Sequence, residues 1–297
     1  MRVQALLVML LVVLSCATAV AQEKTAEEYF RLANEAFIEG DYDKAIDLYL
    51  DSVREKPDLK EAWYNLGVAY GQARNYDKEV QCYRRALELD PAYPRAHYNL
   101  ALALEDSGNF DEALAEYGET IKAEPEALDA LVNMGILLSR MEMLDEARDV
   151  YKRALEVDSS VPDIHYNLGI VYSRKAKKAE DQLEKDAWLQ LEIEVYEKAL
   201  ELRPNFYKAC YNLALAYNKL GDLSGEIKTY ERALAIKKNY PEALYNLAYA
   251  LEEKGDNGRS MEYWKQYIQV ASRFESEKPY VEIARKELKR LQASSAN

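Results

Sequence analysis

The side chains that most often carry out catalysis or bind metals are scarce in this chain. It has two histidines, His97 and His165, and three cysteines, Cys16, Cys82 and Cys210. Neither histidine has a second His or Cys at the spacing of a metal site. The sequence also contains no glycine-rich phosphate loop, no G-x-S-x-G and no H-E-x-x-H pattern. We therefore expect no catalytic residue, no metal site and no cofactor, and we do not expect an enzyme.

A pair of neighbouring residues with a different chemistry recurs along the chain. An asparagine stands before a leucine or methionine at six places, which are Asn65, Asn99, Asn133, Asn167, Asn212 and Asn246. A side-chain amide offers a donor and an acceptor, so it can pair with the backbone of an extended peptide of any sequence. Helix propensity does not explain the repetition, because Asn is a mediocre helix former. The residue before the asparagine supplies apolar area with a polar tip at five of these places, as Tyr64, Tyr98, Tyr166, Tyr211 and Tyr245.

These pairs belong to an internal repeat that covers nearly all of the chain after residue 21. Each repeat combines a leucine or methionine followed by Ala or Gly with a later Tyr or Trp, and the apolar spacing predicts two amphipathic helices. Glycine marks turns within repeats and proline marks the breaks between them, and strand signals are absent. Six repeats have 34 residues and the fifth has 45; they span 26–59, 60–93, 94–127, 128–161, 162–206, 207–240 and 241–274.

The second repeat shows the pattern most clearly. It begins with Trp63-x-x-Leu66-Gly67-x-x-Tyr70, continues with Tyr83-x-x-Ala86 and ends at Pro91. This pattern resembles the tetratricopeptide repeat (TPR) family. The resemblance implies an all-α, right-handed α-solenoid over residues 22–274, with the first helix of each repeat inside and the second outside.

The same resemblance implies that the Tyr–Asn pairs lie on the inner face and form a stripe that binds a protein or an extended peptide. A second interpretation stays open, in which tyrosine packs between first helices and asparagine bonds within the stack. Other inner places carry both signs of charge, so the sequence does not predict the charge of a ligand; they are Glu105, Arg140, Arg174, Lys219 and Glu252.

The repeat also accounts for the rare side chains. His97 and His165 occupy the place that Trp63 holds in its repeat, which predicts a packing role. Cys82 and Cys210 lie four repeats apart, too far for a disulfide, and we expect both to be buried packing residues.

The fifth repeat exceeds the others by eleven residues near 174–188. Eleven residues make about three helical turns, so lengthening both helices nearly preserves their phase. We expect a helical hairpin whose basic first arm pairs with its acidic second arm. Trp188 either seals this hairpin or contacts a partner. After the last repeat, Pro279 precedes an amphipathic segment, which predicts a solvating cap helix within residues 275–297.

Residues 1–21 have the pattern of a secretory signal peptide. Arg2 is followed by an apolar run from Ala5 to Leu14 and by small residues that end at Ala21. The expected product is an exported protein, periplasmic or secreted. An alternative is a membrane-anchored lipoprotein, since Leu14-Ser15-Cys16 resembles a bacterial lipobox and would place a lipid on Cys16.

The formal net charge of −13 makes nucleic acid a poor partner, because phosphate binding needs a basic face. After the leader no segment is apolar enough to span a membrane. We expect a cell-envelope scaffold that binds a segment of a partner protein. The alternatives are a self-assembling structural protein and an accessory subunit of a secretion, pilus or envelope-assembly complex.

Overall fold

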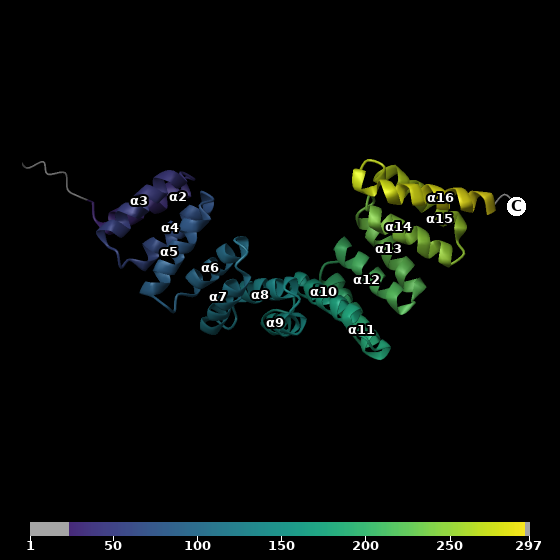
Figure 1. The fold of residues 1–297 in the computed structure, drawn as a ribbon, viewed down its shortest axis with the longest axis horizontal. Helices are drawn as coiled ribbons and strands as arrows, with labels where there is room; N and C mark the ends of the chain where they lie inside the picture. Colours follow the sequence, from purple (N-terminus) through teal and green to yellow (C-terminus); the bar gives the residue numbers. More distant parts are fainter. Residues whose placement is uncertain (1–23, 295–297) are drawn as a thin grey trace, which may run out of the picture. The chain divides into compact units, whose positions relative to one another are not determined.

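The computed structural model describes residues 24–294, and within that range the chain forms fifteen α-helices, one short 3-10 helix and no strand (Figure 1). None of these helices is both long enough and apolar enough to cross a lipid bilayer. The expected signal peptide at residues 1–21, with Cys16, lies outside the described residues.

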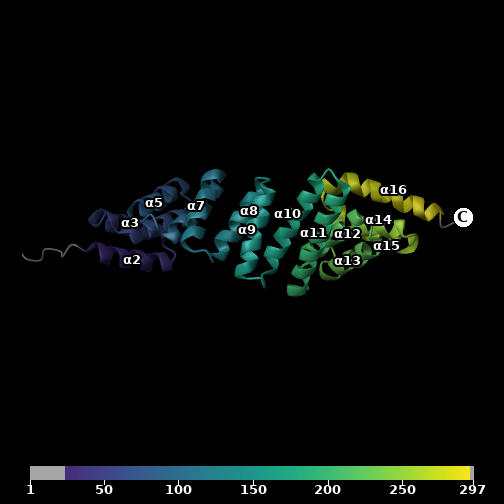
Figure 2. The ribbon, with the colours of Figure 1, turned by 90° about the horizontal axis from the view of Figure 1, so that it is seen from below.

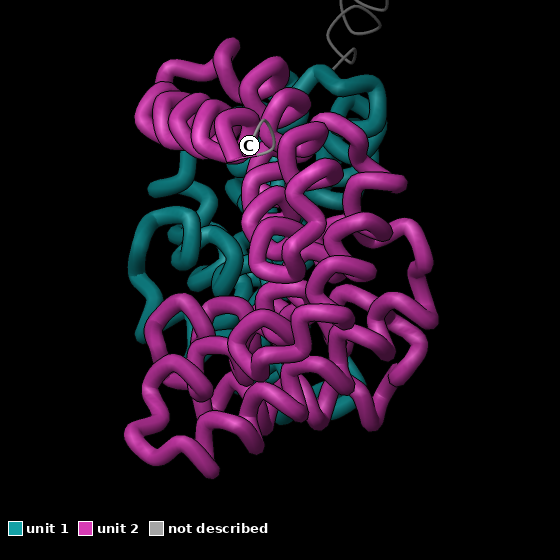
Figure 3. Tube along the Cα trace, turned by 90° about the vertical axis from the view of Figure 1, so that its right-hand side faces the viewer, with its two compact units in different colours: residues 1–127 teal, residues 128–297 magenta. Residues whose placement is uncertain are grey.

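The chain divides into two compact units, Met1–Ala127 and Leu128–Asn297 (Figure 3). The N-terminal unit contains three helix pairs, each made of two helices that pack against each other. These pairs are α2 (Ala26–Ile38) with α3 (Tyr42–Glu55), α4 (Lys60–Gln72) with α5 (Tyr76–Leu89), and α6 (Pro94–Asp106) with α7 (Phe110–Ala123).

The C-terminal unit contains four further helix pairs and a final helix, and each helix packs against the next along the chain (Figure 2). The pairs are α8 (Leu128–Arg140) with α9 (Leu144–Val157), α10 (Pro162–Lys178) with α11 (Gln182–Leu202), α12 (Tyr207–Leu220) with α13 (Leu223–Ile236), and α14 (Pro241–Glu253) with α15 (Asn257–Ala271). The 3-10 helix Glu275–Glu277 leads into the final helix α16 (Lys278–Ser294). Both units are therefore all-α solenoids of helix pairs.

The turn inside each regular repeat needs a residue in the left-handed region. Gly40, Gly108, Gly221 and Gly255 take φ values of 77–84° there, which glycine adopts without steric cost. The second and fourth repeats place Arg74 and Glu142 at the same position, with φ of 59° and 62°. The fifth repeat has Ala176 at this position, and α10 continues through it. The missing break explains why this helix is long.

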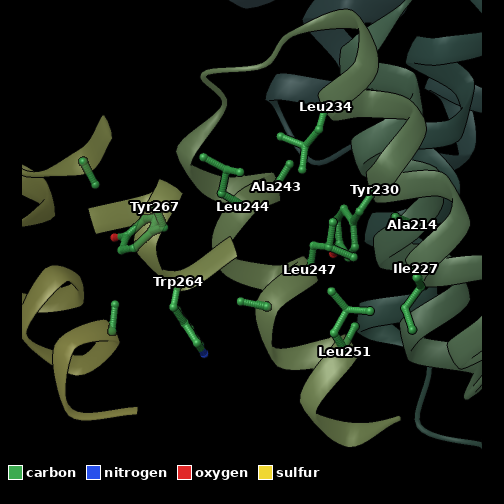
Figure 4. Close-up of a cluster of buried hydrophobic side chains, with 14 of the residues drawn as sticks. Ala214, Ile227, Tyr230, Leu234, Ala243, Leu244, Leu247, Leu251, Trp264 and Tyr267 are labelled. Atoms are coloured by element: carbon green, nitrogen blue, oxygen red, sulfur yellow. The ribbon is translucent and has the colours of Figure 1, made fainter. Parts of the chain in front are cut away.

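First-helix leucines pack in the core with second-helix aromatic residues of the same and the preceding repeat. In the C-terminal unit, Tyr230 of α13 packs in one buried cluster with Leu247 of α14, and neither side chain is exposed by more than 1% (Figure 4). The small residue after the leucine makes room for the aromatic ring. A Cβ added to Gly169 would lie 2.4 Å from Cε1 of Tyr196. This close approach explains why a small residue, Ala or Gly, follows the leucine or methionine in each repeat.

The extra residues of the fifth repeat lengthen both of its helices, to 17 residues in α10 and 21 in α11. Trp188 seals the hairpin: its ring stacks on Tyr172 with centroids 5.7 Å apart, and the Lys175 ammonium lies 4.5 Å from the ring centre.

The prediction that the two arms of this hairpin form ion pairs with each other is wrong. Lys175 pairs with Asp145, and Arg174 and Lys178 pair with Glu142, so the basic arm reaches the α8–α9 turn of the preceding repeat. The reason is local geometry, because that turn lies beside the end of α10 and carries the carboxylates of Glu142 and Asp145.

Helix α16 covers the end of the stack by packing on α15. It buries Val281, Ala284 and Leu291 and exposes the charged residues between them. Cys82 and Cys210 are buried free thiols, as expected for packing residues. Burial raises the pKa of the Cys82 thiol to about 12, which keeps it protonated and unreactive at neutral pH.

Candidate partner-binding stripe

All eleven residues of the predicted stripe lie on first helices, and all are half-buried. In the N-terminal unit Tyr64 and Asn65 are on α4, and Tyr98 and Asn99 are on α6. In the C-terminal unit the remaining residues follow the same order on α8, α10, α12 and α14 and are Asn133, Tyr166, Asn167, Tyr211, Asn212, Tyr245 and Asn246.

Each stripe tyrosine packs against the aromatic residue of the second helix in its own repeat. The ring centroids of Tyr64 and Tyr83 are 5.8 Å apart, and those of Tyr211 and Tyr230 are also 5.8 Å apart. The pairs Tyr98–Tyr117, Tyr166–Tyr196 and Tyr245–Trp264 have centroids 5.1–6.1 Å apart. Tyr64, Tyr166 and Tyr211 also pack on a second ring, from Tyr93, Phe206 and Tyr240, with centroids 4.8–5.2 Å apart. Only part of each half-buried ring is therefore left for contact with a ligand.

Three of the stripe asparagines, Asn99, Asn212 and Asn246, bond to the stripe tyrosine of the repeat before them. Asn99 Nδ2 donates to the Tyr64 hydroxyl over 2.9 Å. Asn212 Nδ2 donates to the hydroxyls of Tyr166 and Tyr196 over 3.4 and 3.3 Å. The amide N–H groups thus link consecutive repeats, which is the structural role left open by the sequence.

This linkage uses the hydroxyl of the stripe tyrosine in the preceding repeat, and the first and fourth repeats have no tyrosine at that place. Phe30 takes the tyrosine place in the first repeat, and Asn65 donates instead to Oδ1 of Asn34 over 2.9 Å. Val132 takes that place in the fourth repeat, and the side-chain amide of Asn167 has no hydrogen bond to any residue between 24 and 294. Asn167 is therefore the stripe asparagine whose amide has no bond within the stack.

The linkage leaves the acceptor side of these amides unused. Within the described part of the chain, no donor reaches Oδ1 of Asn99, Asn212 or Asn246. Because the N–H side is held by tyrosine hydroxyls, each of these amides has a fixed orientation. A fixed acceptor loses little conformational entropy when it accepts a hydrogen bond from a ligand.

The hydroxyls of Tyr64, Tyr166 and Tyr211 are neutral at physiological pH. Burial is the largest cause that raises the pKa of Tyr64, Tyr166 and Tyr211 above its usual value. The pKa of Tyr49, which donates to Asn34, is raised to about 12 by the same cause. These three hydroxyls therefore offer polar, uncharged contacts over the neutral pH range.

A hollow of about 440 Å³ lies beside Asn99 in the N-terminal unit. Its wall includes Tyr83 of α5 and two acidic residues, Glu79 and Asp106. Burial raises the pKa of Glu79. Sequence reasoning missed Glu79, because a glutamate in the first turn of a second helix has the pattern of a solvent-exposed residue.

The histidines have the packing role that their place in the repeat predicts. Nε2 of His97 bonds to the carbonyl of Pro91 over 3.0 Å, and Nε2 of His165 bonds to the carbonyl of Ser159 over 2.9 Å. Trp63 Nε1 donates to the carbonyl of Pro57 over 2.9 Å in the same way. Each ring thus satisfies a carbonyl of the turn that enters its repeat. Between residues 24 and 294, no group of three or more His, Cys, Asp or Glu side chains is arranged to hold a metal ion.

Several solved structures are similar to this chain. The C-terminal part of a TPR repeat-containing protein from Cytophaga hutchinsonii has a TM-score of 0.71 and 17% identity and covers 87% of this chain and 99% of its own. YrrB, described as a TPR protein with an unusual peptide-binding site, has a TM-score of 0.57 and 18% identity over 67% of this chain and 96% of its own. PilF of Pseudomonas aeruginosa has a TM-score of 0.54 and 22% identity and covers 79% of this chain and 97% of its own. These likenesses concern the fold alone.

No curated protein matches this chain. Family models do match it. The model described as TPR repeat matches residues 75–108, 143–175 and 216–255. Models described as tetratricopeptide repeat match residues 94–127, 195–228 and 241–273. Together the matches cover more than half of the chain, and the chain belongs to the tetratricopeptide repeat family.

Proposed function

We propose that this protein is an exported scaffold of the cell envelope that holds an extended segment of a partner protein along its Tyr–Asn stripe, and that its role is binding and not catalysis. The observation that carries the proposal is the state of the asparagine amides. Their N–H groups bond to tyrosine hydroxyls of the preceding repeat, while Oδ1 of Asn99, Asn212 and Asn246 accepts no bond from the described residues.

Such an arrangement suits the backbone of an extended chain. Backbone N–H groups recur along a peptide whatever its side chains, and the fixed acceptors within one unit, such as those of Asn212 and Asn246, can receive them without reading sequence. The half-exposed tyrosine rings add apolar contact on both sides of each acceptor at little cost in side-chain entropy. A likeness of fold to YrrB, whose structure is described as having a peptide-binding site, adds general support.

A capture experiment tests the proposal. The mature protein is immobilised and exposed to an envelope fraction, and bound proteins are identified by mass spectrometry. The triple variant Asn133→Ala, Asn167→Ala, Asn212→Ala is compared with a control, Gln81→Ala, Lys152→Ala, Glu194→Ala, whose three changes lie on exposed second-helix sites. We expect the stripe variant alone to lose the partner while both keep the helical circular dichroism spectrum. Equal capture by both variants would show that the stripe does not bind the partner.

Export is the second part of the proposal and is supported by the pattern of residues 1–21. Cleavage before Gln22 gives a free protein of the periplasm or the exterior. Lipidation at Cys16 gives a protein anchored to a membrane by its N-terminus. The intact mass of the mature protein separates these two products, because only the second begins at Cys16 and carries a diacylglyceryl group. An unprocessed N-terminus beginning at Met1 would contradict both.

Self-assembly through end-to-end stacking has less support. Helix α16 packs on α15, buries an apolar face there and presents charged residues outward. The C-terminal end of the stack is thereby covered, and an open series of repeats would need that end free.

A further inference from the structure

A hollow of about 390 Å³ lies where α10, α11 and α12 meet in the C-terminal unit. Its charged lining is entirely basic, although the whole chain has a formal net charge of −13. The cations are Arg174 and Lys177 of α10, Lys185 of α11 and Lys219 of α12. Cations from three helices around one hollow create a local positive field that the net charge of the chain does not reveal.

Two of these cations are held by the protein. Arg174 bonds to the carbonyl of Ser139 and pairs with Glu142 at 3.2 Å. Lys219 donates to Oγ of Ser173 over 2.9 Å and lies 3.5 Å from the carboxylate of Glu192, which is 1% exposed. These contacts fix the positions of both charges at the wall of the hollow.

The other two cations have no such partner. Neither Lys177 nor Lys185 forms an ion pair with any residue of the described chain. Both belong to the extra length of the fifth repeat, since Lys177 lies in the last turn of α10 and Lys185 in the first turn of α11. The hollow therefore depends on the extra length of the fifth repeat, and two of its four cations form no ion pair within the described chain.

The hollow continues the face that carries the stripe. Arg174 follows Asn167 by seven residues on α10, and Lys219 follows Asn212 by seven residues on α12. Seven residues make about two helical turns and a rise of about 10 Å, which returns to the same face of the helix. A chain that contacts Asn167 and Asn212 and runs toward the C-terminal ends of these helices would reach the four cations within about three to four residues.

We propose that this hollow binds a carboxylate side chain of the partner segment, and that an acidic stretch of the partner sets where the segment lies along the stripe. The proposal rests on the proposed function, because it assigns the chemistry of the segment held there. The asparagine acceptors of the stripe recur along the chain and cannot fix a register, whereas a basic hollow built on the extra helix length of the fifth repeat can. The lining also includes Ala176 and Ala179, which suit the methylene groups of a glutamate.

Anisotropy of a fluorescein-labelled peptide that alternates glycine and glutamate tests the proposal, with the matched glycine–glutamine peptide as reference. The double variant Lys177→Gln, Lys185→Gln removes the two unpaired charges. The control Lys208→Gln, Lys238→Gln removes two exposed lysines of the same unit that also lack an ion pair among the described residues. Both variants remove two positive charges, and neither replaces a buried side chain.

We expect the wild-type protein to bind the glutamate peptide about tenfold more tightly than the glutamine peptide at low salt, with a preference that falls as salt rises. The double variant should lose most of that preference. In the control, the ratio of the two affinities should change by less than about twofold. Equal affinity for the two peptides, or equal losses in the two variants, would overturn the proposal. Displacement of the peptide by inorganic phosphate at concentrations below those of added free glutamate would assign the hollow to a phosphate and also overturn it.

The captured partner separates this proposal from the proposed function. If the stripe variant loses the partner while the lysine double variant holds it as tightly as wild type, the acidic anchor is wrong and the scaffold function stands. If the stripe variant keeps the partner, the scaffold function fails, whatever the peptides show.

Discussion

Asn246 donates a hydrogen bond from its side-chain amide to the hydroxyl of Tyr211, one repeat earlier, over 3.3 Å. The same amide donates to the hydroxyl of Tyr230 over 3.2 Å. The side chains proposed to bind a partner along the stripe therefore also link neighbouring repeats. A loss of binding on mutation of such a residue has two causes, and an asparagine without the structural bond is needed to separate them.

The first prediction compares two such asparagines. Asn246→Ala removes both bonds and leaves the fully buried Tyr230 hydroxyl without this donor, so it should destabilise the C-terminal unit by about 1–2 kcal/mol. Asn167→Ala removes no bond of the described chain and introduces a better helix former, so stability should be unchanged or slightly higher. Urea unfolding followed by circular dichroism measures both, and equal losses would contradict the assigned roles.

The second prediction concerns the close approach of helices within a repeat. Gly169→Ala places a methyl group 2.4 Å from a ring atom of the buried Tyr196, and we expect a loss of about 1–3 kcal/mol. Gly118→Ala on α7 is the matched control, because a Cβ there meets nothing within 4 Å, and it should gain about 0.5–1 kcal/mol. Thermal unfolding midpoints that shift in the same direction would show that the packing of Tyr196 does not require glycine.

The third prediction concerns the left-handed turns. Arg74 has φ of 59° and forms no ion pair among the described residues, so Arg74→Gly should remove backbone strain and gain about 0.5–1 kcal/mol. Glu142 has φ of 62° but pairs with Arg174 and Lys178, so Glu142→Gly should gain less, because it loses those pairs. Calorimetric midpoints of the two variants compare them. A larger gain for Glu142→Gly would mean that its ion pairs contribute nothing.

The fourth prediction follows from the buried Glu192, whose pKa is raised by burial. An acid with a raised folded-state pKa binds its proton more tightly when folded, so the protein gains stability as the pH falls through that pKa toward the unfolded value. At neutral pH the buried charge costs stability, and Glu192→Gln should stabilise the C-terminal unit by about 0.5–2 kcal/mol. The gain should shrink as the pH approaches about 4.5. Unfolding curves of both proteins from pH 4.5 to 8 test this, and a pH-independent difference would contradict it.

The repeats were predictable because their core positions are dictated by packing. Leu247, Ala248 and Trp264 recur with counterparts in every repeat, and such periodicity predicts paired helices without knowledge of their neighbours. The cap helix was predictable for the same reason, since a stack of this kind needs a polar end.

The bonds of the stripe were not predictable, because they join residues of different repeats. That Asn167 lacks a partner follows from Val132, but only once the structure shows that each amide reaches the preceding tyrosine place. The basic hollow was missed because Lys185 comes beside Lys219 only through the way the long hairpin packs. The sequence also misassigned the partners of Arg174, because it favours the nearby acids of the hairpin over Glu142 of the preceding repeat.

The most direct test of the stripe is a photo-crosslink from a position with no structural duty. A benzophenone amino acid replaces Asn167 in one protein and Lys152, on the exposed side of α9, in a second. Each protein is illuminated with the captured partner, and the crosslinked product is measured by mass spectrometry. We predict a crosslink to the partner from position 167 and none from position 152. A crosslink from position 152 alone, or from neither position while the partner remains bound, would contradict binding along the stripe.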